Sequence, residues 1–293
     1  MTYKPDIVIY HANCADGFGA AWAAWRKWGD AVKYGPCAYG QTPPDGAGKH
    51  VLIGDFSFKR DVLTSLSHEA KSIIVLDHHE TAEAELQPWV LESTEPLDAG
   101  NAGVAVDMVH TVAVFDMHRS GAAMMWQFCH PDKTVPLMIQ LIEDRDLWRF
   151  TLHGTKPVGV WLRCEPFDFA RWTSIATALE HDIGAEEIMS QALAMQRFFD
   201  QKVEEIARLA RWGKIGEHQV PLCNCPPMFA SEVGHWLLEE NPDAPFVATY
   251  SDQGLSRGYS LRSRDGRMNV ADIAKKFGGG GHRNAAGFGV PLP

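Results

Sequence analysis

The chain has 293 residues, of which 45% are hydrophobic and 22% are charged. This balance is typical of a folded protein with a sizeable core, and it excludes disorder along the whole chain. The length is about twice that of a common domain, so two domains are expected. The formal net charge of −10 argues against broad electrostatic binding to long or duplex nucleic acid.

The sequence also indicates a compartment. It contains no apolar window of about eighteen residues that would form a membrane span. The first apolar run, Ile7–Tyr10, is too short for a signal peptide. Six cysteines show neither the spacing of a disulfide framework nor that of a zinc knuckle. We therefore expect a reduced, cytoplasmic protein.

The first half of the chain alternates short apolar runs with amphipathic segments. The predicted strands are 6–10, 51–55, 72–76 and 111–115, and the predicted helices are 18–28, 59–70, 121–128 (with Ser120 as its N-cap) and 135–143. Nearly continuous apolar strands separated by helices indicate a parallel sheet that is covered on both faces.

The second half has a different pattern. Apolar residues recur near helical spacing from about 185 to 212, which predicts one long connecting helix. Strands at 246–250 and 255–262 follow, and then a short helix at 269–277. We predict an α/β domain over 1–185, a helical connector over 186–213 and a smaller α/β domain over 214–293.

Polar loops follow the predicted strands and helices of the first domain. They are the loops 11–17, 54–55, 77–79 and 143–146, and they are rich in Asp and His. A single Asp after a strand is more often a turn former or a helix N-cap than a ligand. Four such loops at the carboxyl ends of one sheet instead predict a metal site. Carboxylate and imidazole ligands suit Mn²⁺ or Mg²⁺, with Zn²⁺ and Fe²⁺ as alternatives, and a bridging carboxylate would allow two ions.

The same residues carry a family resemblance. Asp77-His78-His79, with His11, Asp16-Gly17 and Asp55 upstream, resembles the motif set of the DHH phosphoesterases. The segment GGGGHRNAAG at 278–287 resembles the glycine-rich motif of the C-terminal domain that accompanies the DHH domain. The resemblance covers nearly the whole chain, with both domains in the expected order.

This resemblance implies a metal-dependent phosphoester hydrolase, usually with two Mn²⁺ ions. By position, His11 and Asp55 would hold one ion, and Asp16, Asp55, His78 and Asp144 would hold the other. Asp55 would bridge the two ions and Asp77 would orient His78. His79 would face the substrate phosphate. Asp146 is the second choice for the place of Asp144.

The sequence departs from the family pattern at Cys14. The family has a further Asp near this position, so the first metal site lacks a carboxylate. A thiolate is a soft ligand that fits Mn²⁺ poorly, and Cys14 is therefore a doubtful ligand. The alternative is a small packed residue, the usual role of a free cysteine.

The C-terminal motif predicts a phosphate site. Residues 255–283 hold seven basic and two acidic residues, a local charge of +5. The expected substrate contacts are Arg262, Ser263, Gly279, Gly280, Gly281 and His282. The alternative is that the glycines form a linker and the basic residues a solvated face. Trp148 is the aromatic residue expected to stack on a substrate.

The expected function is cleavage of phosphodiester bonds in short oligonucleotides or dinucleotides from one end, in a cleft between the two domains. Two alternatives stay open. One is a phosphomonoesterase or pyrophosphatase acting on 3′-phosphoadenosine phosphate or polyphosphate, and the other is a weakly catalytic nucleotide-binding protein. The sequence does not distinguish the substrate, the direction of cleavage or the oligomeric state.

Overall fold

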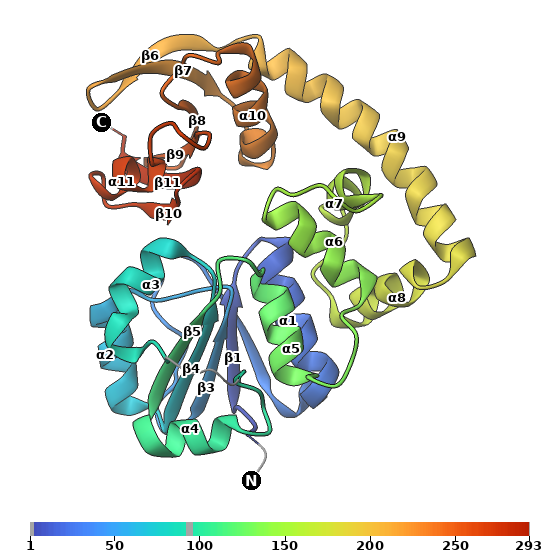
Figure 1. The fold of residues 1–293 in the computed structure, drawn as a ribbon, viewed down its shortest axis with the longest axis vertical. Helices are drawn as coiled ribbons and strands as arrows, with labels where there is room; N and C mark the ends of the chain where they lie inside the picture. Colours follow the sequence, from blue (N-terminus) through green and yellow to red (C-terminus); the bar gives the residue numbers. More distant parts are fainter. Residues whose placement is uncertain (1–2, 92–95, 293) are drawn as a thin grey trace. The chain divides into compact units, whose positions relative to one another are not determined.

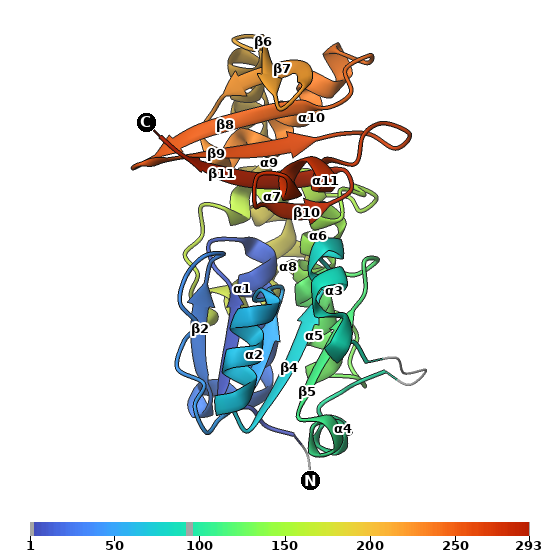
Figure 2. The ribbon, with the colours of Figure 1, turned by 90° about the vertical axis from the view of Figure 1, so that its left-hand side faces the viewer.

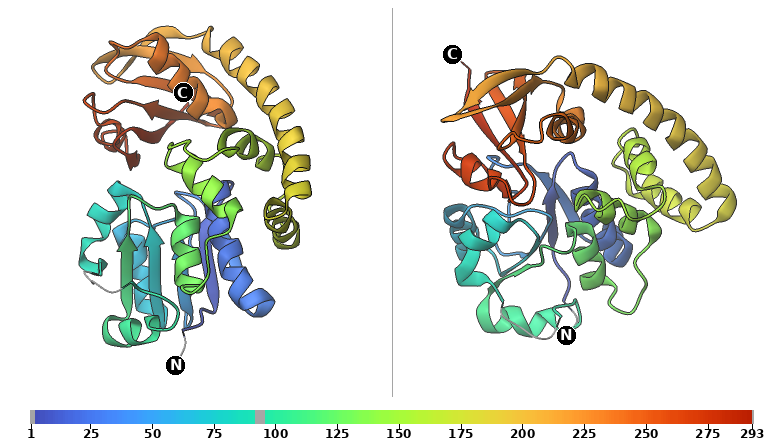
Figure 3. Two further views of the ribbon diagram at one scale, coloured as in Figure 1. Left: turned by 45° about the vertical axis from the view of Figure 1, so that its right-hand side comes forward. Right: turned by 45° about the horizontal axis from the view of Figure 1, so that its top comes forward.

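A computed structural model describes residues 3–91 and 96–292 of the chain. The chain divides into two compact units, Met1–Gln196 and Arg197–Pro293. The division falls within one long helix, α9 (Asp182–Ala207), which is continuous in Figures 1 and 3. Each unit contains one sheet with helices packed against it, which is the α/β class expected from the sequence.

The first unit is built on a parallel sheet with the strand order β2-β1-β3-β4-β5. Its strands are β1 (Ile7–His11), β2 (Lys33–Cys37), β3 (His50–Gly54), β4 (Ser72–Asp77) and β5 (Thr111–Phe115). The chain runs from β1 to β2 on one side and then returns to β3 on the other. In sheets of this kind, ligands bind beside the carboxyl ends of the strands at such a reversal.

Both faces of this sheet are covered by helices (Figures 1 and 2). On one face, Val8, Leu52 and Ile74 pack with α1 (Ala15–Trp28) and α5 (Gly121–Cys129). On the other, alternate strand residues pack with α2 (Arg60–Glu69). The remaining helices of the unit are α3 (Glu80–Leu86), α4 (Ala102–Val109), α6 (Leu137–Asp146), α7 (Thr155–Leu162) and α8 (Phe169–Leu179), with short 3₁₀ turns at Gly29–Ala31 and Gln87–Trp89.

The structure contains elements that the sequence analysis did not predict, and two differences have a clear physical reason. The strand β2 was not predicted, because Gly35 and Pro36 interrupt its pattern; proline is tolerated there since β2 is an edge strand. The long helix was expected to continue to residue 212, but α9 ends at Ala207 and Arg211 begins a strand. Leu209 and Trp212, which extended the apolar pattern, are mostly exposed.

The second unit contains a mixed sheet with the order β10-β11-β9-β8-β7-β6 (Figure 1). Its strands are β6 (Arg211–Ile215), β7 (His218–Asn224), β8 (Val247–Gln253), β9 (Ser256–Arg262), β10 (Gly280–His282) and β11 (Ala285–Pro291); its helices are α10 (Ala230–Glu240) and α11 (Val270–Lys275), with a 3₁₀ turn at Pro227–Phe229. Leu261, Ala286 and Phe288 pack with α11. Across the described ranges 3–91 and 96–292, no helix is both long and apolar enough to cross a membrane.

Candidate metal centre

The fold gathers polar residues from three neighbouring strands of the first unit. His11 is the last residue of β1, Asp55 directly follows β3, and Asp77 ends β4. All three therefore lie at the carboxyl edge of the sheet, and β1 and β3 are the strands that flank the reversal in strand order. The sequence expectation that the polar loops share one edge follows from this parallel arrangement.

One group of donor atoms, the thiol cluster, consists of His11, Cys14 and Asp55. The sulfur of Cys14 lies 3.3 Å from His11 Nδ1 and 3.4 Å from Asp55 Oδ2, and these last two atoms are 3.7 Å apart. Gly17 permits the arrangement, because a Cβ at this position would lie 2.2 Å from the His11 carbonyl oxygen. The first turn of α1 can thus press against the end of β1.

The second group, the carboxylate cluster, surrounds the imidazole of His78. His78 Nε2 lies 3.1 Å from Asp55 Oδ1, 3.5 Å from Asp16 Oδ2 and 3.5 Å from Asp146 Oδ2. Asp16 also accepts hydrogen bonds from the backbone N–H groups of Gly121 and Ala122 at the start of α5. Asp55 therefore turns one oxygen towards each cluster, the arrangement expected of a carboxylate between two ions.

The electrostatics of the carboxylate cluster favour a bound cation. Asp16 and Asp55 are buried, and burial together with the charges of Asp55 and Asp146 raises the pKa of Asp16 well above its usual range. Burial alone would lower the pKa of His78, but the hydrogen bond with Asp55 and the charges of Asp146 and Asp16 raise it to about 10. Three carboxylates that share one imidazole repel one another, and a divalent ion would relieve that repulsion. The donor set therefore fits a divalent metal.

Asp146, rather than Asp144, takes the position facing His78, the reverse of the order expected from the sequence. Asp144 accepts hydrogen bonds from the side chains of Thr151 and Thr155 and from the backbone N–H groups of Thr151 and Leu152. These bonds outweigh burial and lower its pKa to about 2. Residues two apart near the end of a helix point in different directions, and Asp144 fixes the loop that follows α6.

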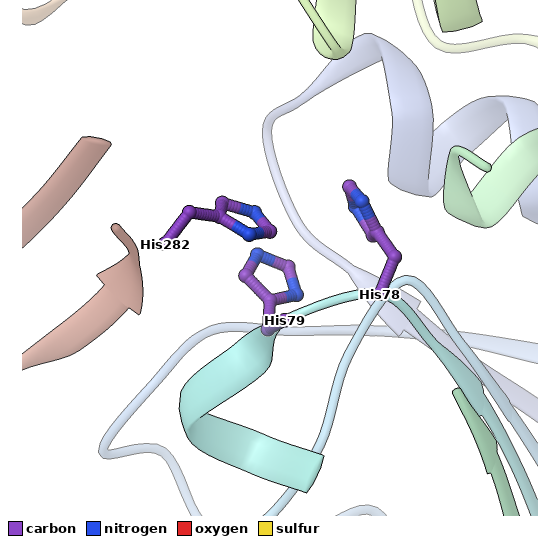
Figure 4. A group of neighbouring side chains, drawn as sticks. All are labelled: His78, His79 and His282. Carbon is purple, nitrogen blue, oxygen red and sulfur yellow. The ribbon is translucent and has the colours of Figure 1, made fainter. Parts of the chain in front are cut away.

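Asp77 forms its carboxylate–imidazole pair with His79, whereas the sequence predicted that it would orient His78. Asp77 Oδ1 lies 2.7 Å from His79 Nδ1 and accepts from the backbone N–H of His78, while Ser57 donates to Oδ2. Burial opposes charge on His79, but Asp77 raises its pKa above the ordinary value. The rings of His78 and His79 have centroids 4.8 Å apart at the end of β4 (Figure 4).

Tyr39 is an aromatic neighbour of this site that the sequence pattern did not reveal. Its ring centroid lies 5.5 Å from that of His11 and 6.4 Å from that of His79, and the side chain is 56% exposed. It follows the unpredicted strand β2, so neither periodicity nor spacing placed it. Trp148, the aromatic residue expected to meet the substrate, packs edge-on against Phe150.

The predicted substrate residues of the second unit lie along three neighbouring strands. Arg262 of β9 pairs with Ala285 of β11, which in turn pairs with His282 of β10, so the three share one face of the sheet. Ser231 and Ser260 accept hydrogen bonds from the Arg262 guanidinium. Ser263 is buried and donates towards Arg283 and Asn284.

The glycine run has a packing role in this sheet. A Cβ at Gly279 would lie 2.0 Å from the Gly287 carbonyl oxygen, and one at Gly281, where φ is +136°, would lie 2.6 Å from that of Ala285. Gly280 pairs with Gly287. The missing side chains thus let β10 lie close to β11, which a flexible linker would not require.

Comparisons with known proteins found relatives by sequence. No protein-family model matches the chain. The chain is 31% identical to the uncharacterized protein R106 of Acanthamoeba polyphaga mimivirus, a similarity that covers 97% of this chain and 67% of R106. It is 23% identical to the oligoribonuclease NrnB of Bacillus subtilis (strain 168) over 78% of this chain, and the similarity spans 55% of NrnB.

Similarity also extends to solved structures. RecJ of Thermus thermophilus, crystallised with Mn²⁺, is 13% identical with a TM-score of 0.48, covering 99% of this chain and 50% of RecJ. The parallel sheet of the first unit places Asp and His side chains at its carboxyl edge, where they could hold a divalent metal ion. The chain belongs to one family with R106. Its ordered motifs His11…Asp16-Gly17, Asp55 and Asp77-His78-His79 resemble those of the DHH phosphoesterases.

Proposed function

We propose that this protein is a divalent-metal-dependent phosphodiesterase that cleaves short oligonucleotides or dinucleotides from one end. The observation that carries the proposal is the orientation of Asp55, with Oδ2 towards His11 and Cys14 and Oδ1 towards His78. A carboxylate that serves two donor clusters is the central part of a two-metal phosphoester hydrolase.

Two ions would be held by side chains already close together. His11, Asp55 and Cys14 would hold the first, and Asp16, Asp55, His78 and Asp146 would hold the second, for which Mn²⁺ or Mg²⁺ suits the oxygen-rich donors. When bound, the metal pair supplies an activated water and neutralises charge on the phosphate. The protein contributes the fixed spacing of the donors, since Asp16 is anchored to the start of α5 and Cys14 to the start of α1.

His79 has a separate role in this proposal. Asp77 fixes the His79 ring through Nδ1 and favours its protonated form. A protonated imidazole beside the centre would donate a hydrogen bond to a phosphate oxygen, and its charge would favour the anionic transition state. Tyr39, at the exposed rim next to His11 and His79, offers a ring on which a terminal base can stack.

The second unit would bind the part of the substrate that does not react. Its local charge of +5 over residues 255–283 contrasts with −10 for the chain, and Arg262 and His282 share one sheet face. Arginine held in a fixed orientation suits a phosphate. Similarity to a protein named oligoribonuclease supports a short RNA as the substrate class.

A product-resolved assay tests the proposal. The purified protein is incubated with Mn²⁺ and, separately, with two- to ten-nucleotide RNAs, linear and cyclic dinucleotides, 3′-phosphoadenosine phosphate and triphosphate. We expect mononucleotides released stepwise from the short RNAs, no turnover after chelation, and turnover by Asp55→Asn that is slower by about 10³-fold or more. Release of phosphate from 3′-phosphoadenosine phosphate or triphosphate alone would establish the phosphomonoesterase or pyrophosphatase alternative. Nucleotide binding without turnover of any substrate would establish a binding protein.

A further inference from the structure

Cys14 occupies a helix N-cap position at which other residue types would stabilise the helix better. It is the N-cap of α1, and its sulfur accepts a hydrogen bond from the Gly17 backbone N–H at 3.1 Å. Ser, Asp, Asn and Thr are the preferred residues at an N-cap because their oxygens accept this bond well. Capping therefore does not account for a cysteine here.

Packing does not account for it either. Structural cysteines are usually buried among apolar side chains, as Cys37 and Cys129 are in this protein. Cys14 is only half-buried, and the neighbours of its sulfur are the imidazole of His11 and the carboxylate of Asp55. These are metal-binding groups, and Asp55 is almost fully buried.

The three donor atoms of the thiol cluster lie close enough together to bind one ion. The distances among Cys14 Sγ, His11 Nδ1 and Asp55 Oδ2 are 3.3, 3.4 and 3.7 Å. A tetrahedral ion with bonds of about 2.3 Å to sulfur and about 2.0–2.1 Å to nitrogen or oxygen separates its donors by about 3.3–3.6 Å. The three separations are close to these values, so one ion could contact all three donors.

We propose that the thiol cluster, His11, Cys14 and Asp55, is a site for a borderline divalent ion of the Zn²⁺ and Co²⁺ class, beside a harder site for Mn²⁺ or Mg²⁺. The inference rests on the proposed function, because the thiol cluster would be the first of its two ion positions. One nitrogen, one sulfur and one oxygen ligand select such an ion over Mn²⁺. The thiol gives up its proton to solvent as the metal–sulfur bond forms. The centre would then hold two different metals.

Absorption spectroscopy with Co²⁺ tests this ligand directly, without reference to activity. Co²⁺ is titrated into the metal-free full chain, into Cys14→Ser and Cys14→Asp, and into the control Cys164→Ser, which alters an exposed cysteine of the same unit. We expect a near-ultraviolet thiolate-to-cobalt band in the wild type and in Cys164→Ser, and its loss in both Cys14 variants. Zn²⁺ should abolish the band when added in stoichiometric amount, whereas equal Mn²⁺ should leave it.

The two Cys14 variants also keep the protein folded, because Ser and Asp are good N-caps; melting curves verify this. Cys14→Asp should lower the ratio of Zn²⁺ affinity to Mn²⁺ affinity by about tenfold or more. Replacing a residue that only hydrogen-bonds to a metal ligand already changes metal affinity by that amount.

A band that persists in Cys14→Ser, or a wild type that binds Co²⁺ and hydrolyses phosphodiesters without showing the band, would overturn this inference and leave the proposed function standing. A wild type that binds no divalent ion in calorimetry would overturn both.

Discussion

Asp144 and Asp146 provide a matched pair of substitutions with opposite expected effects. Asp144→Asn should destabilise the fold and spare metal binding, because the Asp144 carboxylate accepts four hydrogen bonds from the loop after α6. An asparagine amide would turn an N–H₂ group towards the N–H of Thr151 or Leu152, so two donors would face each other. Asp146→Asn should spare the fold and weaken metal binding, because its carboxylate faces His78 and is 36% exposed.

The size of the first effect follows from the pKa of Asp144. Its hydrogen bonds hold this pKa at about 2 instead of the ordinary 3.8. At about 1.4 kcal/mol for each pH unit, the charged form adds about 2 kcal/mol to the free energy of unfolding near neutral pH. Because the pKa is depressed, this contribution is present above pH 3.8 and is lost as the pH falls towards 2. Asp146→Asn should change the free energy of unfolding by less than about 0.5 kcal/mol, as is common for an exposed side chain.

Urea denaturation of the metal-free proteins and calorimetric titration with Mn²⁺ separate the two effects. We expect a lower denaturation midpoint only for Asp144→Asn and a weaker Mn²⁺ affinity, by about tenfold or more, only for Asp146→Asn. A stable Asp144→Asn variant that loses Mn²⁺ binding would show that Asp144 is the ligand, as the sequence suggested, and that it does not fix the loop after α6.

Three further substitutions address other parts of the protein. Asp55→Asn should lower kcat by about 10³-fold or more, about 4 kcal/mol in the barrier, because both clusters lose their shared ligand. A steady-state kcat within tenfold of the wild-type value at saturating Mn²⁺ would contradict the bridging role. Arg262→Ala should raise KM for a short RNA far more than KM for a generic small phosphodiester, because the substitution would remove substrate binding and leave the chemical step unchanged. An equal effect on both substrates would place Arg262 at the reacting phosphate. His130 is buried against the Ala23 carbonyl oxygen, and burial lowers its pKa from 6.5 to about 4. Folding favours the neutral form of His130, so the folded state is destabilised as the pH falls from 7 to 4. Over this range the free energy of unfolding should fall by up to about 3 kcal/mol more in the wild type than in His130→Gln, as measured by urea titrations at each pH. An equal fall in both proteins would contradict the assignment of a buried, neutral His130.

The sheet of the first unit could be predicted from the sequence because its strands are nearly continuous apolar runs. Residues 51–55 and 72–76 have no amphipathic helical alternative, and parallel strands bring their carboxyl ends to one edge. The gathering of His11, Asp55 and Asp77 followed from that rule alone. The strand β2 could not be predicted in the same way, because it is held by pairing with β1 and not by an apolar pattern of its own.

The partners of individual side chains were beyond sequence reasoning. Asp77, His78 and His79 are consecutive, and which imidazole meets the Asp77 carboxylate depends on the turn from β4 into α3. His79 is the N-cap residue of α3 with an extended backbone, which directs its ring back to Asp77 at 2.7 Å. Likewise, the choice between Asp144 and Asp146 depends on the two threonines, seven and eleven residues after Asp144, that bind it.

The centre also depends on residues that carry no chemistry, and these explain how several carboxylates can be buried together. Asp55 adopts a left-handed backbone conformation with φ of +53°, a region that Asp tolerates better than most residues. A Cβ on Gly121 would lie 2.3 Å from the Cβ of Asp55, so only glycine lets the start of α5 lie this close to Asp55. The benefit is electrostatic, because the first N–H groups of α5 point at Asp16 and a helix N-terminus stabilises negative charge. Gly17 brings the start of α1 against His11 in the same way. Gly121 therefore places a helix N-terminus beside the buried Asp16, and the backbone N–H groups there offset part of the free energy that burial of this carboxylate costs.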